Sequence, residues 1–127
     1  MEVIQHKNTL TFKDNNDSFC INFYKRSAAT NFVDFILNTL FSRQTKINKI
    51  DLAKYSSNKT DTPTCIKTFI TETKEKVTLV PYSDGVIYMH KEDGNTTHTV
   101  KASAHELHTC CEYMIYDFAL PIYIMSD

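Results

Sequence analysis

The feature that most constrains this fold is a helix-start signal directly after a strand-like run. Ser103 opens the sequence Ser-Ala-His-Glu, in which the serine oxygen accepts from an early backbone N–H and Glu106 reaches back to the serine N–H. The apolar residues that follow recur at helical spacing and therefore share one helix face: Leu107, Cys110, Cys111, Met114, Ile115 and Phe118. The pattern predicts an amphipathic helix that buries this face.

A second serine, Ser27, follows the strand-like run 19–24 and is predicted to cap a helix over about residues 28–42. Its apolar positions also recur at helical spacing, and they are Ala29, Phe32, Val33, Ile36, Leu37 and Leu40. Both helices are therefore expected to present one apolar face to a common sheet.

Alternating and β-branched runs predict the strands, and turn formers such as the two Asp-Gly dipeptides separate them. The order is β-β-α-β-β-β-β-β-α-β, which predicts an α+β domain: a mostly antiparallel sheet of six to eight strands with two amphipathic helices packed on one face. The predicted strands cover residues 3–12, 19–24, 46–55, 65–72, 77–82, 86–90, 97–101 and 121–125.

Composition indicates a single domain over residues 1–127, with 42% hydrophobic and 23% charged residues. No run reaches the roughly 20 apolar residues of a membrane helix, so no membrane contact is expected.

The first residues lack a signal-peptide pattern, and the four cysteines are expected to be reduced. An intracellular location follows, in the cytoplasm or, for a viral protein, in the nucleus of a host cell. The sequence leaves the oligomeric state open.

Motifs that would carry catalysis or hold a cofactor are not evident. Both glycines are taken up by turns, which leaves no phosphate-cradling loop. His105 and His108 are three positions apart rather than the four of a zinc-protease helix, and Cys110-Cys111 lacks the C-x-x-C spacing. No catalytic residue, metal or cofactor is predicted. His90 and His98 are expected to face each other across a hairpin, so an enzyme with a site assembled across strands stays an alternative.

Charge divides the chain unevenly. Residues 43–76 hold eight basic and four acidic residues, whereas residues 77–127 hold two basic and seven acidic ones. Lys46, Lys49 and Lys54 are therefore candidate nucleic-acid contacts, although few aromatic residues lie between the lysines.

Tyrosine supplies the candidate partner-binding residues, because its large ring buries much area at small entropic cost. The four candidates are Tyr113, Tyr116, Tyr88 and Tyr123. The leading interpretation is a small intracellular, non-catalytic protein-binding factor. A viral or phage protein that binds a host protein and an immunity-type inhibitor both fit this interpretation.

The order of strand, capped helix, strand and meander, used twice, resembles half of a DNA sliding-clamp subunit, and Thr99–Ile124 has that family's general rhythm. This resemblance implies an alternative function as a DNA-replication or transcription-associated factor. The second helix departs from the family, since clamp helices offer basic residues to DNA and its expected exposed positions include Glu106, Glu112 and Asp117.

Overall fold

The computed structural model describes residues 1–41 and 63–120, and within them seven strands and two helices follow the order β-β-β-α-β-β-β-β-α. All strand pairs are antiparallel, so the predicted α+β class is confirmed. The strands are β1 (Glu2–His6), β2 (Thr9–Lys13), β3 (Ser18–Asn22), β4 (Lys67–Ile70), β5 (Lys76–Pro81), β6 (Val86–Asp93) and β7 (Thr96–Ser103), and the helices are α1 (Arg26–Phe41) and α3 (Ala104–Asp117).

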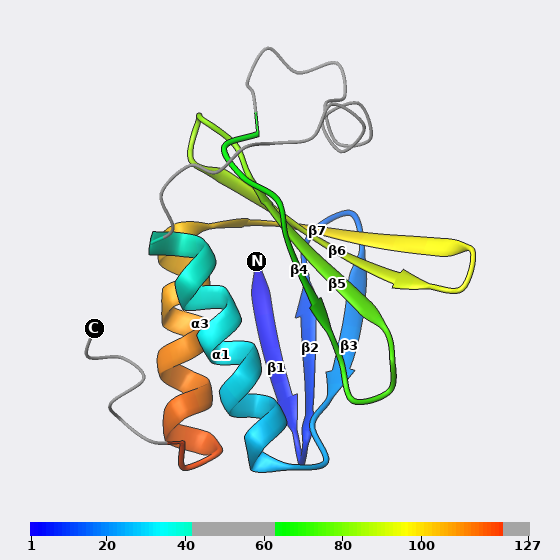
Figure 1. Cartoon of the computed structure of the whole chain (residues 1–127), viewed down its shortest axis with the longest axis vertical. Helices are drawn as coiled ribbons and strands as arrows, with labels where there is room; N and C mark the ends of the chain where they lie inside the picture. Colours follow the sequence, from blue (N-terminus) through cyan, green and yellow to red (C-terminus); the bar gives the residue numbers. More distant parts are fainter. Residues whose placement is uncertain (42–62, 121–127) are drawn as a thin grey trace.

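The strands form two sheets rather than the single sheet that the sequence predicts, a three-stranded one in the order β1-β2-β3 and a four-stranded one in the order β4-β5-β6-β7. The two helices lie side by side and run in opposite directions (Figure 1). Buried side chains from both sheets and both helices join in one hydrophobic core.

The N-terminal region differs from the prediction, because residues 3–12 form two strands rather than one. Lys7 and Asn8 make the turn between β1 and β2, and Lys7 has a φ of 55°. This left-handed conformation favours glycine. Because a lysine occupies the position, the sequence gives no signal for a turn there. The predicted strands 46–55 and 121–125 lie outside the described residues.

Helix α1 begins earlier than the serine signal indicates, so the prediction that Ser27 is its cap is wrong. The helix starts at Arg26, and the Lys25 carbonyl accepts the N–H groups of Ala28 at 3.1 Å and Ala29 at 3.4 Å. Ser27 is exposed within the first turn. Burial of Ala28 and Ala29 sets this start in place of a side-chain cap.

Helix α3 follows the prediction closely. The Ser103 hydroxyl accepts the Glu106 N–H at 3.2 Å, and the Glu106 carboxylate accepts the Ser103 N–H at 2.9 Å, which confirms the capping box. Its apolar face is buried at Leu107, Cys110, Cys111 and Met114, with Ile115 and Phe118 partly buried against the core.

Phe32 of α1 joins the helix to both sheets. Its ring lies 6.1 Å from that of Phe12 on β2 and 5.4 Å from that of Phe69 on β4, measured between centroids. It also contacts Phe23 and Phe35, so one fully buried ring sits at the centre of an aromatic cluster.

Two carboxylates join the sheets where β3 lies beside β7. Asp14 and Asp17, from the turn between β2 and β3, accept the backbone N–H groups of Lys101 at 2.7 Å and Thr99 at 3.0 Å on β7. Asp17 also lies 3.2 Å from the His98 imidazole. These carboxylates thereby accept N–H groups on the side of β7 where no further strand pairs within residues 1–41 and 63–120.

The pKa values of these two carboxyl groups reflect this arrangement. For Asp17, the N–H groups of Ser18 and Thr99 lower the pKa. For Asp14, burial raises the pKa, but the hydrogen bonds from Lys101 and from its own turn outweigh burial and lower it. Both groups are therefore held in the charged form that accepts the bonds.

Candidate functional site

Two tyrosines of α3 form an exposed surface that we call the tyrosine flank, Tyr113 and Tyr116. Tyr116 is 86% exposed and Tyr113 is 39% exposed. Because they are three residues apart on a helix, their side chains are neighbours. The structure thus brings together two of the four predicted partner-binding tyrosines.

Tyr113 is oriented by polar contacts at the edge of the first sheet. Its hydroxyl donates to the Gln5 side-chain oxygen of β1 at 3.2 Å. Burial raises the pKa of Tyr113, and a hydrogen bond with the Asp117 carboxylate raises it further. The hydroxyl therefore stays protonated, and the ring is held between α3 and β1.

A groove of about 360 Å³ lies between α3 and β1, next to Tyr113. Its rim includes the Glu106 carboxylate, which is bound by the Met1 amino group as well as by the capping serine. Burial raises the pKa of Glu106, but the Met1 ammonium and Ser103 outweigh burial and lower it. The groove is lined by Met1, Val3, His105, Glu106, Thr109, Cys110 and Tyr113.

Tyr88 belongs to a different surface. Its neighbours on β6, Ile87 and Met89, are buried in the core, so Tyr88 points to the opposite face of the four-stranded sheet. The centroid of its ring lies 5.4 Å from that of the Tyr82 ring and 6.2 Å from that of the His90 ring, on which it stacks. The structure therefore separates Tyr88 from the tyrosine flank.

The remaining candidates, Tyr123, Lys46, Lys49 and Lys54, lie outside the described residues. Their proposed roles in partner or nucleic-acid binding stay predictions.

The histidine pair expected across the β6–β7 hairpin does not form. The loop consists of Gly94 and Asn95, so His90 pairs with Thr99 and His98 pairs with Lys91. Successive positions of a strand point to opposite faces, which places the two imidazoles on different sides of the sheet.

The histidines and cysteines of α3 also diverge. His105 is exposed, and His108 lies 2.9 Å from Glu112 on the surface. Cys110 and Cys111 face the core, where burial raises the pKa of Cys110 to about 12. Within residues 1–41 and 63–120, no group of three or more His, Cys, Asp or Glu residues is placed to hold a metal ion.

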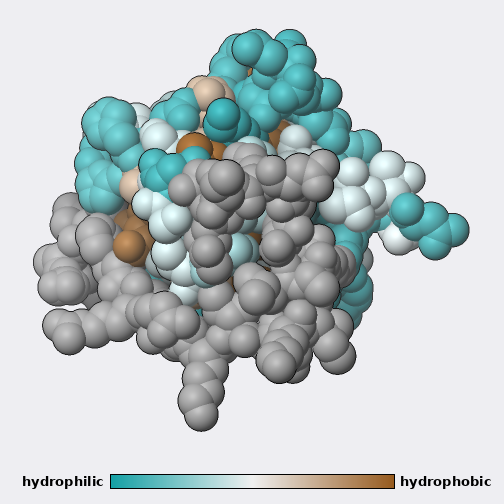
Figure 2. All heavy atoms as spheres, turned by 90° about the horizontal axis from the view of Figure 1, so that it is seen from above, coloured by the Kyte–Doolittle hydropathy of each residue, from teal (hydrophilic) through white to brown (hydrophobic). Residues whose placement is uncertain are grey.

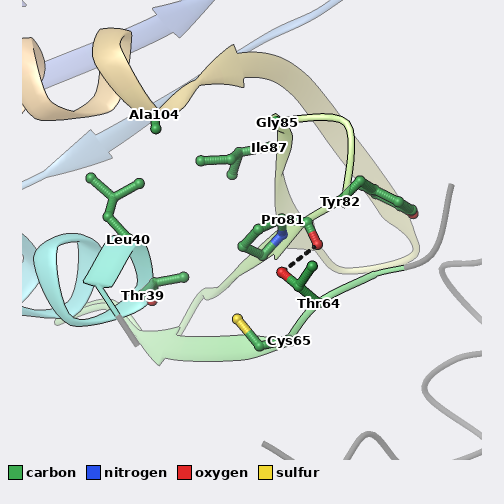
Figure 3. A pocket seen from close by; sticks show the side chains of 9 residues that line it. All are labelled: Thr39, Leu40, Thr64, Cys65, Pro81, Tyr82, Gly85, Ile87 and Ala104. Carbon is green, nitrogen blue, oxygen red and sulfur yellow. Dashed lines mark hydrogen bonds between the residues drawn. The ribbon is translucent and has the colours of Figure 1, made fainter. Parts of the chain in front are cut away.

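A smaller cavity of about 170 Å³ lies where the end of α1, the segment before β4, the β5–β6 turn and the start of α3 meet (Figure 3). Thr64 closes one side, because its hydroxyl donates to the Pro81 carbonyl at 3.2 Å. The described residues that line it are Thr39, Leu40, Thr64, Cys65, Pro81, Tyr82, Gly85, Ile87 and Ala104, a set without a charged side chain. No sequence motif marks this cavity, and these described residues offer no acid–base pair for catalysis.

The sequence does not predict the buried lysine on β6. Lys91 of β6 donates to the Cys20 carbonyl of β3 at 2.6 Å and pairs with the Glu75 carboxylate at 2.7 Å. Both of its partners are more than ten residues away in sequence, so no local pattern could have indicated the contact. It is a structural link between the two sheets.

The end of the molecule that carries the β5–β6 turn gives no stronger candidate. Seen from the end that carries the β5–β6 turn, the visible described surface is mostly hydrophilic, with hydrophobic atoms in small patches (Figure 2). Neither described helix is long and apolar enough to cross a membrane.

Comparison with protein-family models, with curated proteins and with solved structures finds no match. The proposed function is therefore based on the residues at the surface of this chain.

Proposed function

We propose that this chain is a non-catalytic protein-binding factor that contacts its partner through the tyrosine flank of α3. The observation that carries the proposal is the 86% exposure of Tyr116 beside the partly exposed, oriented ring of Tyr113. Large aromatic side chains on a rigid helix bury much area while losing little conformational freedom.

The surroundings of the flank support a protein partner. The groove between α3 and β1 offers an apolar recess beside Tyr113 for a partner side chain. Glu112 and Asp117 are exposed on the same helix, so a partner surface with lysine or arginine complements this side. The same acidic positions weigh against DNA contact by this helix.

The experiment compares capture of proteins from the source cell by wild type, by Tyr116→Ala and by Ile70→Ala. Ile70 is the matched control, because it is 55% exposed but lies on β4. A partner that binds the flank is retained by wild type and by the Ile70 variant, and is lost with Tyr116→Ala.

Titration of the purified partner then gives the size of the effect. If Tyr116 is a hot spot, its removal weakens Kd roughly 30-fold, or about 2 kcal/mol. Equal affinity of wild type and the Tyr113→Ala/Tyr116→Ala double variant contradicts the proposal.

A further inference from the structure

Two of the four edge strands, β7 and β4, are protected against pairing with another strand. The N–H groups of β7 at Thr99 and Lys101 are taken by Asp17 and Asp14. β4 has only four residues and begins with Lys67, and short strands with lysine are a common protection for an edge.

β1 lacks these protections. In the described part of the chain it pairs with β2 only, over five residues in unbroken register from Glu2 to His6. It contains no lysine, proline or bulge. An edge of this kind is a template for a further strand.

The order of side chains on β1 is complementary to itself. Exposed and half-buried residues alternate, so Glu2, Ile4 and His6 share the outer face while Val3 and Gln5 point towards α3. A carboxylate and an imidazole thus stand at equal distances on either side of Ile4, an isoleucine that is 44% exposed.

We infer that β1 pairs with β1 of a second copy of this chain, antiparallel about a two-fold axis at Ile4. In this register Glu2 of each copy lies opposite His6 of the other, and the imidazole N–H donates to the carboxylate in two symmetric places. Ile4 of each copy covers that of the other.

This register uses the whole strand. Because the two-fold axis lies midway between the two Ile4 residues, all five residues of each copy are paired, whereas any shift leaves end residues unpaired. The two three-stranded sheets then join into one sheet of six strands. The dimer engages the edge of β1, which adjoins the groove and the Tyr113–Gln5 contact of the tyrosine flank, so the two proposals are tested with different variants.

The pairing surface is small. One strand pair buries less than the roughly 1,600 Å² of a standard interface, so a reversible dimer with a Kd in the micromolar range or above is expected. Sedimentation velocity on the full chain, at a series of concentrations up to about 1 mM, is expected to show a shift from 14.7 kDa towards twice that mass. A monomer throughout overturns the inference.

Substitution at the axis tests the register. Ile4→Lys and Ile4→Glu each place like charges opposite each other, so each variant alone is expected to be monomeric. A one-to-one mixture of the two is expected to restore the dimer, because lysine then faces glutamate. A mixture that stays monomeric, while each variant keeps the wild-type circular dichroism and melting curve, overturns the pairing at Ile4.

A charge swap gives a second, independent test. Glu2→Lys is expected to weaken the dimer by about tenfold or more, and adding His6→Glu in the same chain is expected to restore it, because residue 2 faces residue 6.

Ile70→Lys on the β4 edge is the control and is expected to leave the dimer unchanged. If Ile70→Lys removes association, or if a ring larger than a dimer forms, copies pair through β4 and the β1 dimer is excluded. Partner binding by the tyrosine flank is measured in a separate experiment with the Tyr113 and Tyr116 variants. A failed dimer test therefore does not contradict the proposed function.

Discussion

The two helices begin in different ways, although both cover the same core. At the start of α3, the Ser103 hydroxyl and the Glu106 carboxylate accept two N–H groups reciprocally. At the start of α1, the carbonyl of Lys25 is the acceptor for the N–H groups of Ala28 and Ala29, and the first turn holds no acidic residue.

The difference shows which force positions each helix. A cap contributes about 1 kcal/mol, whereas a buried phenylalanine contributes several times as much through transfer and packing. α1 inserts Phe32 into an aromatic cluster that spans both sheets, and this contact sets its position. α3 combines a buried face with a start that its local sequence also specifies.

The largest expected effect is at the centre of α1. Phe32→Ala should lower the free energy of unfolding by about 3–5 kcal/mol, because it leaves a cavity that touches both sheets. Urea denaturation measures the loss, and Phe35→Ala, at a half-buried position of the same helix, should cost less. A loss below about 1 kcal/mol for Phe32→Ala would remove the packing explanation for α1.

The corresponding change in α3 is Leu107→Ala. Leu107 is fully buried, so the loss should be about 2–5 kcal/mol by the same measurement. His108→Ala, one position further and on the surface side, serves as the control and should stay within about 0.5 kcal/mol. Similar losses at both positions would mean that the helix face is assigned incorrectly.

The cap itself should contribute less than either core residue. Ser103→Ala should cost about 1 kcal/mol, because the Glu106 N–H loses its acceptor. Ser103→Asp, which keeps an oxygen at the cap, should recover most of this stability. Thermal melting of the three proteins compares them, and an unchanged melting temperature in Ser103→Ala would disprove the role of the capping box.

The charge at the start of α3 should make that helix sensitive to acid. The Glu106 pKa is lowered in the fold, so its contribution is complete above the unfolded value of about 4.3 and is lost as the pH falls through the lower folded value. Wild type should therefore exceed Glu106→Gln in stability at neutral pH, and the difference should shrink below about pH 4. A difference that does not depend on pH would rule out this contribution.

The smallest effect is expected at the start of α1. Ser27→Ala should change stability by no more than about 0.5 kcal/mol, since the Ser27 side chain is exposed in the first turn and is not the cap. A loss of stability equal to that of Ser103→Ala would mean that Ser27 does cap α1. The two helices would then begin in the same way.

The sequence by itself determined the α+β class, the buried faces of both helices and the capping box of α3. Each of these depends on residues within a few positions of one another, where helical or strand periodicity is visible. The tyrosine flank was predictable for the same reason, since Tyr113 and Tyr116 stand off the apolar stripe of α3.

Only the tertiary structure decided the contacts between distant segments. The bonds of Asp14 and Asp17 to β7 span more than eighty residues, and the Tyr113–Gln5 contact spans 108. The start of α1 and the turn at Lys7 also contradict their local signals, because burial of the neighbouring apolar residues outweighs the preference of a single serine or lysine. Such positions follow from packing free energy summed over the whole core, which no local pattern contains.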